Sequence, residues 1–230
     1  MPTNLLERVP VVSYVFFGLF VVASLIHLYF CFMEQEKWRK ITKPFCLLFL
    51  TLTIAFFIPQ YPLVYLGLAF GLAGDTFLLK KHKIWPFVGG MVSFLIGHIL
   101  YIIQLILIAK PDHYAYYLVM GLYLILAILF GYRLCNKIVR TKPLALGGDI
   151  YLCVLSLDLI WAIVACARGH FDFCFPVVLG SICFLISDFY LAYTSFVSNK
   201  KRRDFYIMIT YLLAQFLIAT GLAFTLVLAG

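Results

Sequence analysis

The segment LGSICFLISDFYLAY (179–193) places a carboxylate, Asp188, inside an otherwise apolar run. A charge at the centre of a bilayer costs at least about 2.5–3.5 kcal/mol, and intramembrane acids commonly belong to functional sites. A second acid, Asp75, lies near the end of a similar run, GLAFGLAGDTFLL (67–79). Two buried carboxylates that are close together do not readily ionise at once, which supplies an acid and a base. Asp75 and Asp188 are therefore the candidate catalytic residues, for general acid–base chemistry with water.

Each acid also has a structural interpretation. Asp75 lies five residues before Lys80, so it can be an interfacial charge. Asp188 lies ten residues before Ser198, about 15 Å along a helix, which is too deep for that explanation. Asp188 can still be a structural carboxylate that accepts hydrogen bonds from Tyr or Thr hydroxyl groups.

Other polar side chains in the apolar runs are candidate substrate-binding residues, because they need partners where water is absent. They are Lys43, His98, Tyr101, Tyr151, Tyr211 and Gln215. His98 can also be a hydrogen-bonded core residue, and Lys43 can extend its ammonium group to the membrane interface. No group of His, Cys, Asp or Glu in the sequence has metal-ligand spacing, so we expect neither a metal site nor a cofactor.

The elements that must position these residues are membrane-spanning helices. Hydrophobic residues make up 64% of the 230-residue chain and charged residues 12%, and the mean hydropathy is +1.03. Soluble domains average about 25% charged residues, so the composition indicates an integral membrane protein with one domain, 1–230. Eight apolar runs are suited to spanning a bilayer: 10–33, 44–59, 62–79, 86–109, 114–132, 149–167, 174–197 and 206–229. The predicted fold is all-α, a polytopic membrane protein with eight transmembrane helices, the first of them an uncleaved anchor.

The basic residues predict the orientation of these helices. Fifteen of the 18 Lys and Arg residues follow the first, third, fifth and seventh runs, and only Arg8, Lys110 and Arg168 lie on the other side. The positive-inside rule then places both termini outside the cytosol. The net charge of +8 is explained by topology beside an anionic leaflet, so no nucleic-acid partner is expected. For a eukaryotic source, an uncleaved first helix without other targeting elements favours the endoplasmic reticulum; the oligomeric state is not predicted.

A weak parallel repeat relates the third and fourth helices to the seventh and eighth. With an offset of 113 residues, Gly67 aligns with Gly180, Asp75 with Asp188, and His98 with Tyr211. Such repeats place sites between the two halves, near the pseudo-twofold axis. Gly67 and Gly71 also share a helix face with Asp75, which predicts close helix packing beside the acid.

The seven cysteines show no CxxC or metal spacing and lie mostly in apolar segments. Buried free thiols are the expected state. Cys166 and Cys174 flank one short loop and could pair if that loop faces an oxidising lumen.

In the predicted orientation, the polar groups gather in the cytosolic half of the bilayer. They predict a pocket that opens to the cytosolic leaflet, with an acidic floor, aromatic walls and a basic rim. A single-tailed membrane lipid fits such a pocket, with its chain among Phe and Leu side chains and its head group near the basic residues.

Several short motifs resemble those of a known family. They are GDTFLL, FLIGHILY (94–101), GSICFLISD (180–188) and TYLLAQFLI (210–218), in this order, with Lys43-Pro44 ahead of them and Tyr151 between. Over about residues 43–221 the chain resembles the YhhN-like lysoplasmalogenases, which are eight-helix membrane enzymes. The resemblance implies a lysophospholipid substrate and hydrolysis of the vinyl ether bond of lysoplasmalogens. The implied products are a fatty aldehyde and glycerophosphocholine or glycerophosphoethanolamine, and no cofactor is needed.

The resemblance also implies roles for particular residues. Asp75 and Asp188 match the two Asp motifs of the family. The residues that match its polar pocket positions are His98, Tyr101, Tyr211, Gln215, Tyr151 and Lys43. The hypothesis for the mechanism is that one acid protonates the vinyl ether while the other stabilises an oxocarbenium-like ion and activates water, as in glycoside hydrolysis.

Asp158 departs from the family pattern, in which an apolar residue, often Met, is expected. Either it faces the pocket and changes the head-group preference, or it faces another helix and is paired structurally. Two other classes of function also stay open: a transporter that uses intramembrane acids, and a lysolipid-binding or sensing protein without turnover. Alternating access needs a site reachable from both faces, and the one-sided polarity argues against the transporter.

Overall fold

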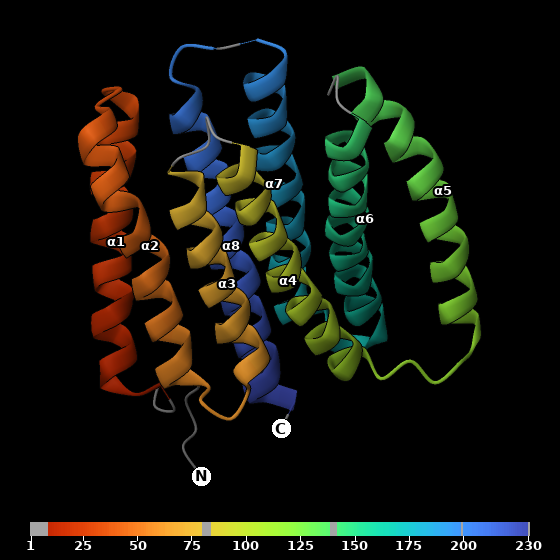
Figure 1. Ribbon diagram of the computed structural model, residues 1–230. Coiled ribbons are helices and arrows are strands. Elements are labelled where there is room, and N and C mark those ends of the chain that lie inside the picture. The colour runs from red at the N-terminus through yellow and green to blue at the C-terminus, as the bar shows by residue number, and fades with distance from the viewer. Residues whose placement is uncertain (1–8, 80–83, 139–141, 199, 230) are drawn as a thin grey trace.

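The computed structural model describes residues 9–79, 84–138, 142–198 and 200–229. These residues form eight α-helices and one π-helical turn: α1 (Val11–Phe32), α2 (Glu36–Phe57), α3 (Pro62–Leu78), α4 (Ile84–Ala109), α5 (Ala115–Ile138), α6 (Lys142–Ala165), η2 (Cys166–His170), α7 (Phe171–Phe196) and α8 (Arg203–Ala229). Figure 1 shows them as an up-and-down bundle in which the start of α1 and the end of α8 lie on the same side. The described part contains no strand, and the predicted all-α fold with eight helices is confirmed.

Six of the described helices are long and apolar enough to cross a membrane. The 17-residue helix α3 and the apolar part of α5, Tyr116–Gly131, are shorter. At 1.5 Å per residue, α3 extends about 26 Å, slightly less than the roughly 30 Å hydrocarbon core. Both helices run alongside the longer ones in Figure 1, so the bundle has eight parallel or antiparallel segments.

Several helices extend beyond the apolar runs that predicted them. Helix α2 begins at Glu36 instead of residue 44, α5 continues to Ile138 and α6 begins at Lys142. Hydropathy marks where the apolar segment ends, whereas Glu, Lys and Arg are good helix formers that let the backbone continue. As a result Asp149, expected at the start of its helix, lies about two turns inside α6 and is buried.

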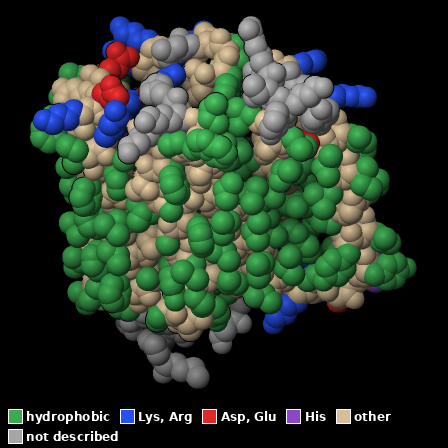
Figure 2. Space-filling model, viewed as in Figure 1, with side chains coloured by type: hydrophobic (Ala, Val, Ile, Leu, Met, Phe, Trp, Pro, Cys, Tyr) green, Lys and Arg blue, Asp and Glu red, His purple; other side chains and the backbone are tan. Residues whose placement is uncertain are grey.

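Most of the described Lys and Arg side chains lie at one end of the bundle, as predicted. Figure 2 shows them at the end where α2 and α8 begin, while hydrophobic side chains cover the body. Four other basic residues that predict the orientation of this end lie outside the described residues: Lys80, Lys81, Lys83 and Arg140. Arg8, which the sequence assigns to the opposite side, also lies outside them.

The link between α6 and α7 is the π-helical turn η2, which contains Gly169 with φ +99°. A positive φ of this kind suits glycine, because it has no Cβ. Cys166, the first residue of η2, and Cys174 on α7 are both free thiols, so the disulfide considered from the sequence does not form. None of the seven cysteines, all of which lie within the described ranges, forms a disulfide, and five of them are buried.

Helix α8 lies at the centre of the bundle and contacts α1, α2, α3, α4 and α7. The predicted repeat appears in its packing. Gly67 on α3 lies against the ring of Tyr101 on α4, and Gly180 on α7 lies against Ala214 on α8. Residues 101 and 214 are again 113 positions apart. Within each pair, the two helices therefore come close at equivalent positions, and a glycine lies at each of these contacts.

The close approach at Gly67 predicts that this position tolerates no side chain. A Cβ there would overlap ring carbons of Tyr101, and overpacking of this kind costs about 1–3 kcal/mol. We expect Gly67→Ala to lower the melting temperature of the detergent-purified protein. Gly18→Ala on α1 is the matched control, because nothing lies within 4 Å of its added Cβ. Equal melting temperatures for the two variants would contradict the packing described for α3 and α4.

Candidate active site

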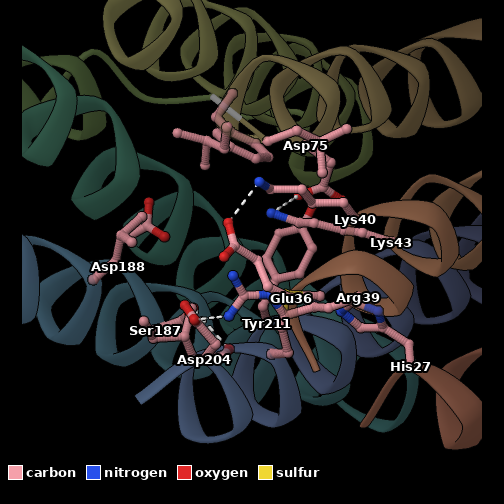
Figure 3. Close-up of a pocket in the computed structure, with 16 residues that line it drawn as sticks. His27, Glu36, Arg39, Lys40, Lys43, Asp75, Ser187, Asp188, Asp204 and Tyr211 are labelled. Atoms are coloured by element: carbon pink, nitrogen blue, oxygen red, sulfur yellow. Dashed lines mark hydrogen bonds and ion pairs between the residues drawn. The ribbon is translucent and has the colours of Figure 1, made fainter. Parts of the chain in front are cut away.

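A polar pocket opens between the ends of α2, α3, α7 and α8 at the basic end of the bundle (Figure 3). It has a volume of about 700 Å³ including its open mouth. Both candidate acids line it, together with three cations, Arg39, Lys40 and Lys43. The pocket therefore combines acids at its inner wall with a cationic side formed by one turn and a half of α2.

Asp75 is buried on α3 and has a partner at each carboxylate oxygen. Lys43 from α2 places its ammonium nitrogen 3.0 Å from Oδ1. Tyr211 from α8 donates its phenolic hydrogen to Oδ2 at 3.0 Å. The Lys43 side chain is only 15% exposed, so it turns inward to this acid and does not extend to the membrane interface. Three helices thus meet at one carboxylate.

Asp188 is half-buried on α7, and the hydroxyl group of Tyr151 on α6 donates a hydrogen bond to its Oδ2. Tyr151 is itself buried. Among the described residues, no Lys, Arg or His lies within ion-pair distance of Asp188. The two acids therefore have different surroundings: within the described part of the chain, Asp75 pairs with a cation and a phenol, and Asp188 pairs with a phenol and no cation.

A second, apolar pocket adjoins the polar one and has a volume of about 800 Å³ including its open mouth. Its walls include Phe87, Met91 and Phe196. The residues that line both pockets are Leu78, Phe94, Leu191 and Asp188. Asp188 is the only acid in that shared group. Its carboxylate therefore lies at the junction between a basic, polar space and a hydrophobic space.

The structure places three of the predicted site residues elsewhere. His98, Tyr101 and Gln215 are buried but line neither pocket. The ring of Phe184 packs against His98, with centroids 4.3 Å apart, and against the pocket residue Tyr211, with centroids 5.6 Å apart. Their role as substrate contacts stays a prediction.

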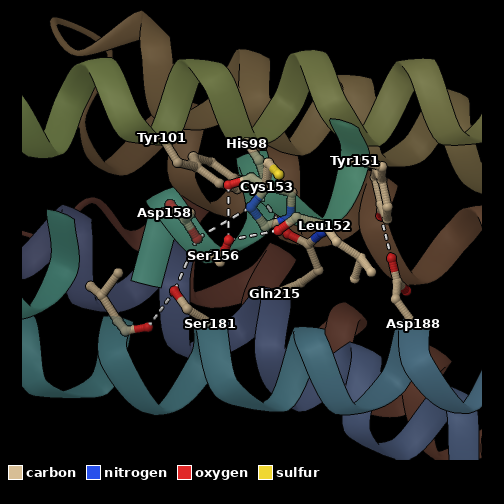
Figure 4. Close-up of polar contacts among 11 residues, drawn as sticks. His98, Tyr101, Tyr151, Leu152, Cys153, Ser156, Asp158, Ser181, Asp188 and Gln215 are labelled. Carbon is tan, nitrogen blue, oxygen red and sulfur yellow. Dashed lines mark hydrogen bonds and ion pairs between the residues drawn. The ribbon is translucent and has the colours of Figure 1, made fainter. Parts of the chain in front are cut away.

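These residues belong to a buried polar network (Figure 4). His98 Nδ1 lies 3.2 Å from Asp158 Oδ2, and Ser181 donates to the same oxygen at 2.9 Å. Tyr101 donates to Gln215 Oε1 at 3.2 Å. Asp158, the residue that departs from the family pattern, therefore faces α4 and α7 and is paired structurally. It does not line either pocket.

The sequence analysis did not single out Arg39 or Asp204, which both line the polar pocket and form an ion pair between α2 and α8. The sequence explains Arg39 as a topology charge alone. Its position one turn before Lys43 puts it on the same helix face, and this spacing is the signal that could have identified it. Asp204 is a lone acid directly after the basic run KKRR (200–203), which is a comparable signal.

The fold and this site define the chain as a polytopic helical membrane protein with two acids in a polar pocket, one of which, Asp188, also lines an adjoining apolar pocket. The model of the YhhN family matches residues 38–222, and the chain belongs to this family. The matched range includes both acids, Arg39 and Asp204. A search of the curated proteins gave no match, and a search of the solved structures gave none.

The pairing of Asp158 predicts a structural role that is separable from the pocket. Asp158→Ala removes the acceptor that His98 and Ser181 share, and an unsatisfied buried polar group costs about 1–3 kcal/mol. We expect a lower melting temperature in detergent and a smaller loss for Asp158→Asn, which keeps an acceptor oxygen. Asp112→Ala, which removes an exposed carboxylate paired with Arg168, is the control and should change stability little. A melting temperature of Asp158→Ala equal to that of the wild type would contradict the network.

Proposed function

We propose that this protein hydrolyses the vinyl ether bond of lysoplasmalogens, the alkenyl forms of glycerophosphocholine and glycerophosphoethanolamine. The products are a fatty aldehyde and the glycerophospho alcohol. The observation that carries the proposal is the position of Asp188 at the junction of the two pockets. A lysoplasmalogen has the same two parts, a phosphate-bearing head and one hydrocarbon chain, and its vinyl ether lies between them. Membership of the YhhN family supports the same conclusion.

The two pockets match the two parts of this substrate. The polar pocket, with Arg39, Lys40 and Lys43, suits the glycerophosphate head. The apolar pocket, with Phe87 and Met91, suits the chain. A lipid that occupies both pockets brings its vinyl ether to Asp188, within a space that Asp75 also lines.

The surroundings of the two acids support different roles. Asp75 pairs with the Lys43 ammonium group, as a carboxylate does, and it is suited to act as the base. Asp188 has no described cation beside it, only the Tyr151 hydroxyl group, and it is suited to act as the acid. General acid–base groups typically contribute 10²–10⁴-fold each to a rate.

The reaction starts with proton transfer from Asp188 to the alkenyl carbon remote from the ether oxygen. The double-bond electrons form the new C–H bond, which leaves an oxocarbenium-like ion at the carbon bonded to oxygen. Water attacks this carbon while Asp75 takes up its proton, giving a hemiacetal. The hemiacetal then passes its hydroxyl proton to Asp188. The bond to the glycerol oxygen breaks, and that oxygen takes the proton from Asp75, so both acids return to their initial states.

The roles of the acids predict the behaviour of isosteric variants. Asp75→Asn and Asp188→Asn should each lower kcat for aldehyde release by at least about 10²-fold. The readout is aldehyde formation from a lysoplasmalogen by the detergent-purified protein, with melting temperatures measured alongside. Asp112→Asn, an exposed acid outside both pockets, is the matched control and should keep wild-type activity. Full activity in either site variant would exclude that acid from the chemistry.

The C–O bond that breaks distinguishes this mechanism from direct attack on the glycerol side. In D₂O, aldehyde that is trapped immediately should carry one deuterium on the carbon next to its carbonyl group. In H₂¹⁸O, the glycerophospho alcohol should carry no label, because the bond that breaks is on the alkenyl side. An unlabelled aldehyde carbon, or ¹⁸O in the alcohol, would contradict the mechanism. A well-folded wild type that binds the lipid and releases no aldehyde would favour a lipid sensor or carrier.

We further propose that the pocket faces the cytosol, with both termini on the other side, in the endoplasmic reticulum of a eukaryotic source. The support is the clustering of basic residues at the pocket end of the bundle (Figure 2), together with the positive-inside rule. Accessibility of tags placed at the two termini in sealed microsomes tests this orientation, and tags exposed on the cytosolic side would refute it.

A further inference from the structure

Each Lys and Arg that the structure describes in the lining of the polar pocket already has an acidic partner. The ion pairs are Lys43 with Asp75, Lys40 with Glu36, and Arg39 with Asp204 (Figure 3). A phosphate group that enters this pocket must therefore compete with a carboxylate for a cation. The pair that it can displace at the lowest cost determines where the phosphate binds.

Two of the three pairs are poorly suited to this exchange. Lys43 neutralises the buried Asp75, and removing it would leave that carboxylate without its cation. Lys40 and Glu36 form an exposed pair within α2, with side chains 46% and 62% exposed. An exposed ammonium group is strongly hydrated and contributes little to a specific contact.

The pair of Arg39 and Asp204 has the opposite properties. It joins α2 to α8, and both side chains are 19% exposed, so water screens it less. The planar guanidinium group of Arg39 matches two oxygens of a phosphate at once. Both residues line the polar pocket, and they also line a neighbouring cleft that contains Lys200 and Lys201.

Asp204 retains favourable surroundings after it separates from Arg39. It lies in the first turn of α8, where free backbone N–H groups and the helix dipole stabilise a negative charge. Arg203 also places Nε 3.8 Å from Asp204 Oδ1. Losing Arg39 to a phosphate therefore does not leave Asp204 as an isolated charge.

We propose that Arg39 binds the phosphate group of the lysolipid and that Asp204 holds its guanidinium group in the empty site, as an internal substitute for that phosphate. The identity of the ligand rests on the proposed function. The exchange makes Asp204 a competitor of the substrate. Arg39 is then the residue that distinguishes a phospholipid from a neutral lipid with the same chain.

Binding of two uncleavable ligands tests this proposal. One is a saturated 1-alkyl-glycerophosphocholine, and the other is the matching 1-alkylglycerol, which has no phosphate. For Arg39→Gln we expect the Kd of the phospholipid to rise about ten-fold or more, because a charge-assisted contact is lost, while the Kd of the alkylglycerol stays unchanged. For Asp204→Asn we expect the Kd of the phospholipid to fall, because the competing carboxylate is gone.

The opposite changes in the Kd of the phospholipid, a rise for Arg39→Gln and a fall for Asp204→Asn, distinguish this proposal from a purely structural ion pair. If the pair only joined α2 to α8, both variants would break it and both would weaken binding. The gain in Asp204→Asn cannot come from misfolding, so this arm stays informative even if Arg39→Gln is unstable. Lys37→Ala, which removes a basic residue of the same helix outside the polar pocket, is the control and should leave both Kd values unchanged.

The binding assay also separates this inference from the proposed hydrolysis. A wild type that binds the phospholipid through Arg39 but releases no aldehyde would refute the hydrolase and leave the phosphate site in place. A wild type that releases aldehyde while Arg39→Gln binds both ligands normally would refute the phosphate site alone.

Discussion

A carboxylate inside a bundle that faces hydrocarbon needs a partner from another helix, because no water is present to solvate it. Asp75 on α3 meets Lys43 from α2 and Tyr211 from α8. Asp188 on α7 meets Tyr151 from α6. Asp158 on α6, in turn, lies between α4 and α7, where it pairs with a histidine and a serine. These contacts join six of the eight helices, so the buried acids link the helices that surround the pockets.

The repeat explains how one fold provides two acids with different properties. Asp75 and Asp188 occupy equivalent positions on α3 and α7, and in each case a partner comes from the preceding helix. That partner is an ammonium group for one acid and a phenol for the other. His98 is the repeat equivalent of Tyr211. Tyr211 pairs with the pocket acid Asp75, whereas His98 pairs with Asp158. Equivalent helix positions with different partner side chains can keep one acid ionised and the other protonated. General acid–base chemistry requires such a difference.

Much of the fold and the two acids could be predicted from the sequence, because ionisable residues are rare in apolar helices and each one needs an explanation. Spacing along a helix also indicated a common face, but it could not tell which neighbour that face meets. For this reason it did not reveal that Phe184 packs against His98, or that His98 and Gln215 line neither pocket. Arg39 and Asp204 escaped notice because topology accounts for charges at helix ends, and their pairing across α2 and α8 depends on the tertiary arrangement.

The central claim is that a single-tailed phospholipid occupies both pockets with its ether group at Asp188. An experimental structure with a bound saturated 1-alkyl-glycerophosphocholine tests this claim most directly. The account predicts the alkyl chain beside Phe87 and Met91, and the ether oxygen next to the carboxylates of Asp75 and Asp188. A chain bound instead in the outer groove of α7 and α8, which Tyr190 and Tyr206 line, with its head group away from both acids, would contradict it.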